Sequence, residues 1–518
     1  MTFDPTQRYD RQIRLWGAHG QFCLTKSSVL VIGSTVAASE TIKNLVLPGI
    51  GSVFILDNTI VTENDIDLDF FIQPSDVGKL RSSCLCEGYR KLNPNVEFTA
   101  LNEDPNSCSL STILNSTKPS LVLPVNLSLS RLAECLSLCK SLHIPVVSLH
   151  VTGPFFMLRM FTGLRTAVET HPTALKFDPI LKHPTTGMFS LLEKLENRAL
   201  DFSLIPWPVL LLFAIKKWKV ARDTVKYPTV DDYEELISIV LDYLAGDQIN
   251  ESFVELKAQI FSALETLSLP PVIQQGFSLL TKHKKLSGRF WTLFRCLSLF
   301  FEEFGRLPHN GFIPDMNSDP QSFLIIRNDL RSLHESDIQH LLKCYHSLSG
   351  SSESETNLDS IISDLTRFSK NIWNLEIKEY PLEFLPVSSE GITSLKQNMW
   401  DPNCTKLFGA FIALLKFQDV HHRSPSLDTP SDVVLLASLR SEVEKEFLFN
   451  EGDLDDVVTS NWVEELLRGG SNQLHCVGAI AGATTAQEAV KVLTGQFVSL
   501  DNTFIWNSIR TVGTTIKL

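Results

Sequence analysis

The sequence contains no Cys-x-x-Cys pair, and its ten cysteines are scattered along 518 residues. Without that spacing it offers no structural zinc site. Scattered, unpaired cysteines are typical of a reducing compartment. Cys135 and Cys139 are four residues apart on an expected helix, and we interpret them as two core thiols one turn apart.

Long apolar runs and a basic excess are also missing. The longest apolar run, residues 208–215, is far shorter than the about 20 residues that cross a bilayer. Residues 1–14 are polar and charged, unlike a secretory signal. The net charge is −13 and the pI about 5.5, which argues against nucleic acid as the main partner. We therefore expect no membrane and no nucleic-acid partner, and a location in the nucleus and cytoplasm.

The first part of the chain alternates strand and helix patterns. Helices are expected between buried strands, and such alternation predicts a parallel, doubly wound sheet of the α/β class. The expected strands are residues 28–33, 52–57, 96–100, 121–125 and 146–149, and the expected helices are residues 40–47, 79–92 and 130–142.

From about residue 160 the pattern changes. Apolar residues recur at helical spacing, as in residues 277–304, which predicts mainly α-helical structure. Residues 347–357 and 421–431 are rich in Ser, Pro and acidic residues and are expected to be surface loops.

Near residue 473 the α/β pattern returns. A helix of small residues, 478–493, is followed by a strand at residues 503–506. We therefore expect a large, mainly helical insertion within one sheet domain. The chain then has three segments. Residues 1–160 form the first part of the sheet domain, residues 161–472 form the insertion, and residues 473–518 form the returning part of the sheet domain.

The turn after the first strand has the position of a phosphate-binding turn. In nucleotide-binding α/β domains this turn is rich in glycine, so that the backbone approaches a phosphate at a helix N-terminus. Here only Gly33 remains, and Val36 and Ala37 add side chains. Asp57 ends the second strand, where an acid can bind a ribose hydroxyl. We interpret the turn as one that has lost its ligand, with Asp57 capping it.

Three basic residues are candidates for phosphate contact. Arg11 and Arg14 precede the first strand, and a guanidinium suits a triphosphate. Lys79 follows Gly78 at an expected helix start. From residue type alone, Arg11 and Arg14 are better explained as ordinary surface arginines. For Lys79, phosphate contact and an ordinary solvated side chain are equally consistent with the sequence. The residues supply no intrinsic catalytic set, and the small residues of the C-terminal helix favour close packing on a neighbouring element.

Several motifs together resemble the adenylation domain of ubiquitin-like-protein activating enzymes. Residues 9–17 (YDRQIRLWG), residues 45–52 (LVLPGIGS), Asp57 and the Gly78-Lys79 pair carry the resemblance. Residues 479–496 with residues 500–502 resemble the family's returning segment, so that the match covers about the first 160 and the last 45 residues. The stretch GFIPD at residues 311–315 resembles the neddylation-type regulatory subunit in particular.

The sequence departs from the active members of that family at three places. The glycine-rich turn is degraded, residues 65–71 replace an Asn-Arg-Gln block, and residues 123–126 (LPVN) lack the acid that holds magnesium. The resemblance therefore implies a Rossmann-like adenylation domain that does not adenylate by itself. The helical insertion resembles the family's catalytic-cysteine domain without its cysteine, since Cys296 lies in an apolar pattern typical of a buried thiol.

The heterodimers of this family pair a degenerate subunit with an active one. The resemblance implies that a catalytic partner subunit binds ATP and Mg²⁺ and carries the thioester cysteine, while this chain binds no cofactor or metal. Gly33, Asp57 and Lys79 would form the degenerate nucleotide site. Arg11, with Arg14 second, would reach the partner's ATP in trans. The expected partners are that catalytic subunit, a neddylation-type modifier and its conjugating enzyme.

Three alternatives remain open. The equivalent subunit for the SUMO modifier shares the N-terminal motif but is much shorter, so the long insertion favours the neddylation type. A dinucleotide-dependent oxidoreductase would explain Gly33 and Asp57 but lacks two expected glycines. A pure interaction scaffold would leave Arg11 without a role in the ATP site.

Overall fold

The computed structural model describes residues 8–170, 175–197, 204–244, 251–283, 286, 288–349, 358–384, 402–447, 465–469 and 474–518. The chain divides into two compact units. The sheet unit comprises Met1–Arg165 and Lys378–Leu518, and the helical unit comprises Thr166–Ile377.

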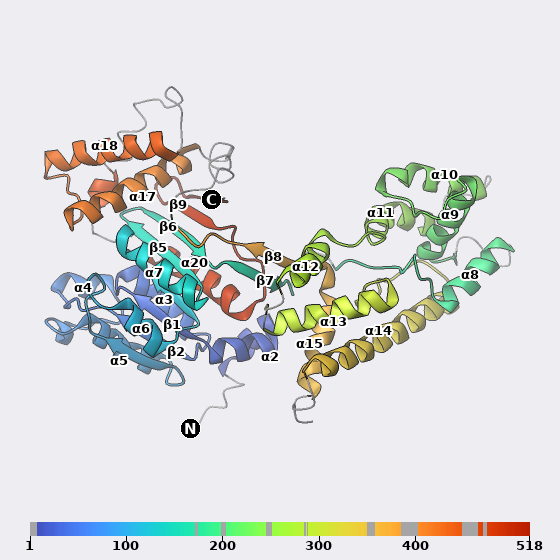
Figure 1. Ribbon diagram of the computed structural model, residues 1–518, viewed down its shortest axis with the longest axis horizontal. Helices are drawn as coiled ribbons and strands as arrows, with labels where there is room; N and C mark the ends of the chain where they lie inside the picture. Colours follow the sequence, from blue (N-terminus) through green and yellow to red (C-terminus); the bar gives the residue numbers. More distant parts are fainter. Residues whose placement is uncertain are drawn as a thin grey trace. The chain divides into compact units, whose positions relative to one another are not determined.

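An eight-stranded sheet forms the centre of the sheet unit, in the order β10-β9-β6-β5-β4-β1-β2-β3 (Figure 1). Strands β1 to β5 run parallel, and β6, β9 and β10 each run antiparallel to their neighbours. The expected doubly wound, mostly parallel sheet is therefore confirmed. The strands are β1 (Ser28–Ile32), β2 (Ser52–Leu56), β3 (Glu97–Leu101), β4 (Leu121–Pro124), β5 (Val146–Thr152), β6 (Phe155–Phe161), β9 (Thr503–Asn507) and β10 (Val512–Ile516).

Alternating side chains of the buried strands enter two cores, one on each face of the sheet. In β1, Val29 and Val31 belong to one core, and Leu30 and Ile32 to the other, as the two-residue period of a strand requires. The first core contains side chains of α3 (Val36–Val46), α5 (Arg81–Leu92) and α20 (His475–Thr494), and the second those of α6 (Leu110–Thr117), α7 (Leu129–Leu142) and α17 (Pro402–His421).

The C-terminal boundary of the helical insertion differs from the expected one. The helical unit ends at Ile377, not near residue 472. Helix α17 contacts α7 and β9, and α18 (Pro430–Phe447) contacts α17. The apolar side chains of α17 therefore complete the core of the sheet unit. Helical periodicity reveals that such a segment is a helix, but not which core it enters.

The helical unit is mainly α-helical, as expected, and its buried residues form two cores. The periodic stretch at residues 277–304 is two helices, which end and begin on either side of Gly288 (φ +104). A short two-stranded sheet pairs β7 (Leu164–Val168) with β8 (Leu375–Glu379). The helices are α8 (Thr186–Glu196), α9 (Trp207–Ala221), α10 (Tyr233–Leu244), α11 (Glu251–Glu265), α12 (Pro271–Lys282), α13 (Arg289–Phe304), α14 (Pro320–Ser349) and α15 (Leu358–Lys370).

No helix in the described ranges is both long and apolar enough to cross a membrane.

Candidate functional site

The turn between β1 and α3 lies at the carboxyl ends of the parallel strands, where α/β sheets bind ligands. The backbone N–H of Gly33 donates to the Leu56 carbonyl at 2.9 Å. Gly33 has φ +97, and a Cβ atom there would lie 2.8 Å from the Val125 carbonyl oxygen. Glycine is thus required by the fold of the turn itself, whether or not a phosphate binds.

Asp57 holds this turn in place. Its Oδ2 atom accepts the Ser34 N–H at 2.7 Å and its Oδ1 atom accepts the Thr59 N–H at 2.6 Å. The side chain is only 5% exposed. The carboxylate therefore caps two backbone segments, one after β1 and one after β2, instead of facing an open ribose site.

The first turn of α3 is covered by α20. Val36 and Ala37 are buried, and a Cβ atom on Gly478 would lie 3.0 Å from Val36 Cγ1 and 3.5 Å from the Ala37 nitrogen. The Ala38 N–H already donates to Thr35 Oγ1 at 3.4 Å. A phosphate at a helix N-terminus must reach these amides, so the close packing of α20 leaves it no room.

Asn126 follows β4, where active members of the family carry the acid for magnesium. Its Oδ1 atom accepts the Val151 N–H at 2.7 Å, and its Nδ2 atom donates to the Val151 carbonyl at 3.0 Å. Its own N–H donates to the Leu149 carbonyl at 2.9 Å. Asn126, with φ +54, therefore bridges the ends of β4 and β5 through both polar atoms of its amide. A neutral amide with both polar atoms engaged does not supply the carboxylate ligand that a nucleotide-bound magnesium ion needs.

Lys79 is exposed and pairs with Asp76 at 3.0 Å on the same turn. That pair is a surface ion pair, which contributes little to stability. The Lys79 ammonium therefore already has an acid of this chain as its partner.

A buried charge network occupies the region of residues 65–71. Arg81 contacts Asp65 and donates to Asp69 Oδ2 at 3.3 Å, and Ser39 donates to Asp69 Oδ1 at 3.0 Å. Burial raises the pKa of Asp69, although Arg81 opposes the rise. Sequence reasoning missed this network. Its signal was a pair of acids spaced i, i+4, Asp65 in the first turn of α4 (Glu63–Leu68) and Asp69 at its C-cap. Arg81 opens α5, the next α-helix.

The N-terminal motif is fixed to the sheet unit by its aromatic residues. It forms the first half of α2 (Asp10–Lys26), a helix that is broken at Gly17. Tyr9 and Trp16 are buried. The Tyr9 hydroxyl accepts from Asn93 Nδ2 at 3.0 Å, and Trp16 Nε1 donates to Gln21 at 3.1 Å. The buried side chains of Tyr9 and Trp16 therefore fix one face of this helix segment to the sheet unit.

The two arginines of this motif lie on its solvent side. Arg14 pairs with Asp10 at 3.0 Å and its side chain is 78% exposed. Arg11 is also exposed and makes no hydrogen bond or ion pair with the residues that the structure describes. Neither arginine serves the fold of this chain, and Arg11 is the better placed to contact another molecule.

The structure offers no reactive thiol at Cys296. The residue is fully buried, and burial raises the pKa of its thiol to about 12, which keeps it protonated at neutral pH. Within the described ranges, no group of three or more His, Cys, Asp or Glu side chains could hold a metal ion.

Curated relatives match almost the whole chain, and a family model matches its first part. The ThiF family model matches residues 9–154. The NEDD8-activating enzyme E1 regulatory subunit of Gallus gallus is 30% identical over 99% of this chain and 98% of its own length. The protein of the same name in Caenorhabditis elegans is 26% identical over the full length of both. Among solved structures, the tRNA N6-threonylcarbamoyladenosine dehydratase of E. coli covers 32% of this chain, with a TM-score of 0.27 and 19% identity.

The similarity to these regulatory subunits therefore extends through the sheet unit and the helical insertion alike. The chain belongs to the family of NEDD8-activating enzyme E1 regulatory subunits.

Proposed function

We propose that this chain is the regulatory subunit of a heterodimeric NEDD8-activating enzyme and has no adenylation or thioester activity of its own. One observation carries the proposal. The strand ends that bind ATP and Mg²⁺ in active members are occupied here by protein groups, namely α20 over the first turn of α3 and the Asn126 amide between β4 and β5. The name that the full-length relatives carry supports the same role.

The catalytic subunit of the heterodimer then supplies what this chain lacks. It binds ATP and Mg²⁺, adenylates the C-terminal carboxylate of the modifier, and receives the modifier on its cysteine. The modifier is NEDD8, and its conjugating enzyme is the next partner of the complex. The location that we propose, nucleus and cytoplasm, can be tested with a fluorescent fusion of the chain.

Arg11 is the residue of this chain that we assign to the partner's ATP site. It lies on a helix segment fixed by Tyr9 and Trp16, so its position is defined before assembly. Its guanidinium has no competing acid within the described structure. An arginine supplied in trans stabilises charge that develops on the phosphates. Arg14 shares its charge with Asp10 and is the second candidate.

The test is Arg11→Ala in the assembled heterodimer. We expect normal assembly by size-exclusion chromatography and modifier-dependent ATP–pyrophosphate exchange that is slower by about 10²-fold or more, the effect of losing one charge-stabilising donor. Arg14→Ala should slow exchange less. Arg331→Ala is the matched control, because Arg331 is an exposed helical arginine with an i, i+4 acid, Glu335, in the helical unit.

An unchanged exchange rate with Arg11→Ala would refute the assignment and favour a pure scaffold. Adenylation of SUMO instead of NEDD8 by the purified heterodimer would favour the SUMO-type alternative. The family to which the chain belongs argues against the oxidoreductase alternative, and a rise in melting temperature with NAD would reopen it.

A further inference from the structure

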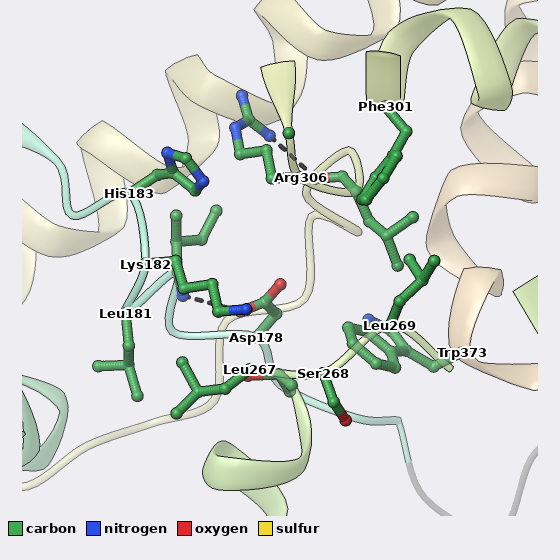
Figure 2. Close-up of a pocket in the computed structure, with 14 residues that line it drawn as sticks. Asp178, Leu181, Lys182, His183, Leu267, Ser268, Leu269, Phe301, Arg306 and Trp373 are labelled. Carbon is green, nitrogen blue, oxygen red and sulfur yellow. Dashed lines mark hydrogen bonds between the residues drawn. The ribbon is translucent and has the colours of Figure 1, made fainter. Parts of the chain in front are cut away.

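A cavity of about 110 Å³ lies within the helical unit, far along the chain from the N-terminal motif. It is formed by the segment before α8, the link between α11 and α12, the end of α13, and Trp373. Half of the fourteen residues that line it are aliphatic or aromatic, and the polar side chains come from Asp178, Lys182, His183, Thr266, Ser268 and Arg306 (Figure 2). The apolar residues that line it are Ile180, Leu181, Leu267, Leu269, Phe301, Leu307 and Trp373.

Asp178 is the acid of this cavity. Its Oδ1 atom accepts the Ile180 N–H at 2.8 Å. Figure 2 shows a carboxylate oxygen of Asp178 directed into the middle of the cavity. Among the described residues, no ion pair to Asp178 is formed. Burial raises the pKa of Asp178 to about 6, as expected for a carboxylate in an apolar site. The Thr266 side chain also hydrogen-bonds to this carboxylate. Two carboxylate oxygens can accept about four hydrogen bonds, so some of their capacity is left for a ligand.

The backbone at the same place is strained. Ile180 has φ +52, a conformation that is unfavourable for a β-branched residue. In this conformation the Ile180 N–H donates to Asp178, and the Ile180 side chain lines the cavity. Strained residues of this kind gather at ligand sites, where the surrounding structure over-determines them.

The charges around the cavity indicate that its occupant is neutral. Arg306 points away from Asp178 in Figure 2 and binds both oxygens of Asp337, at 2.7 and 2.8 Å. Among the described residues that line the cavity, Lys182 is then the one cation that forms no ion pair with a carboxylate. Counted with Asp178, it leaves the lining without a net charge, and the cations that act most strongly on Asp178 are Arg306 and Lys176.

His183 does not alter this balance. Burial, together with the nearby Arg306 and Lys182, lowers the pKa of His183, so the imidazole is neutral at pH 7. A cationic ligand would leave an unbalanced positive charge, and an anionic one would face Asp178.

The size of the cavity limits the inserted group to one small ring. A cavity of about 150 Å³ accommodates benzene, and this cavity is somewhat smaller but opens to solvent. Phe301 and Trp373 provide aromatic contacts, and the Asp178 carboxylate provides an acceptor for one O–H donor.

We propose that this cavity binds the phenol group of a ligand, with the ring against Phe301 and Trp373 and the hydroxyl donating to Asp178. The phenol could be a tyrosine side chain of a protein partner or a free phenolic molecule. This inference does not depend on the proposed role of Arg11 or on modifier activation, because it concerns binding in the helical unit alone.

The test uses the full-length chain and fluorine NMR with three ring probes of similar size. 4-Fluorophenol should show saturable binding. 4-Fluorotoluene, which lacks the hydroxyl, and 4-fluorobenzylamine, which is a cation, should each bind at least tenfold more weakly. Equal binding of the toluene, or stronger binding of the amine, would contradict the role given to Asp178. No binding of 4-fluorophenol would overturn the proposal.

Two variants place the probe in the cavity. Asp178→Asn keeps an acceptor for the Ile180 N–H but can turn a donor toward the phenol, and Leu269→Trp fills the space. Each should weaken 4-fluorophenol binding at least tenfold, while Asp223→Asn, an exposed acid of the same unit, should not. Binding that survives both substitutions would refute the site. If Asp178→Asn does not fold, Leu269→Trp decides.

The source of the phenol is distinguished by competition. If N-acetyl-tyrosinamide displaces 4-fluorophenol, the cavity admits a tyrosine with its backbone, which supports a protein partner. If 4-fluorophenol binds and N-acetyl-tyrosinamide does not displace it, the site takes free phenolic molecules.

Discussion

Replacing Asn126 with aspartate tests whether this strand end is a structural bridge or a dormant magnesium site. In the native chain the amide accepts from the Val151 N–H at 2.7 Å and donates to the Val151 carbonyl at 3.0 Å. An ionised carboxylate can accept, but it cannot donate. In Asn126→Asp, one carboxylate oxygen would therefore face the Val151 carbonyl oxygen at hydrogen-bond distance, with no proton between them.

The expected loss of stability follows from one broken hydrogen bond. A buried carbonyl left without its donor costs about 1–3 kcal/mol. Val151 is buried, but Asn126 itself is exposed, so water partly compensates and about 1 kcal/mol at pH 7 is expected. Protonation would restore the donor, so folding should raise the pKa of the new carboxyl. A group of that kind contributes stability at low pH and loses it as the pH rises. The defect should therefore be smaller at pH 4 than at pH 7.

The assay is urea unfolding at both pH values, with Asn115→Asp as the control. Asn115 is exposed on α6, and its amide donates only to the Ser111 carbonyl of the same helix, so its replacement should change stability by no more than about 0.5 kcal/mol. Equal stability of Asn126→Asp and the native chain at pH 7 would refute the bridge. A gain of Mg²⁺-dependent ATP binding by this variant would show instead that only the acid was missing.

Two further predictions concern the core of the sheet unit. Gly482→Ala should destabilise the chain by about 1–3 kcal/mol through overpacking, because the new Cβ would lie 2.6 Å from Glu40 Cβ. This loss should exceed the gain of about 1 kcal/mol that alanine brings to a helix. Gln487→Ala, at an exposed position of α20, is the control, and an unchanged stability of Gly482→Ala would contradict the close packing of α20 on α3. Burial lowers the pKa of His150 to about 4, so the unfolded chain takes up this proton first and stability should fall by up to about 3 kcal/mol as the pH drops from about 6.5 to about 4. His150→Gln should flatten that part of the pH–stability curve, and an unchanged slope would exclude His150 as its source.

Much of the sheet unit could be predicted from sequence, because its signals are local. The strand starting at Ser28 and the helix ending at Leu142 lie within a residue or two of their expected bounds. Helix α3 begins at Val36, earlier than expected, since Thr35 caps it. Strand β6 was not predicted, although it is buried along its whole length as β5 is. The Gly153-Pro154 pair between them was the sequence signal of a tight turn.

The candidate site could be predicted only in part. The loss of glycines was visible in the sequence, and so was the missing acid at Asn126. What fills the site was not, because α20 returns to α3 from more than 400 residues along the chain, and no local pattern encodes that contact. The same holds for α17, whose helical period gave no sign that it enters the core of the sheet unit.

The central claim is that this chain cannot activate the modifier alone and enables its partner to do so. The most direct measurement is NEDD8-dependent ATP–pyrophosphate exchange, first with this chain alone and then with the catalytic subunit added. We expect no exchange by the chain alone, and exchange by the mixture well above the rate of the catalytic subunit by itself. Exchange by this chain alone would contradict the account, since it would mean that ATP binds despite α20 and the Asn126 bridge.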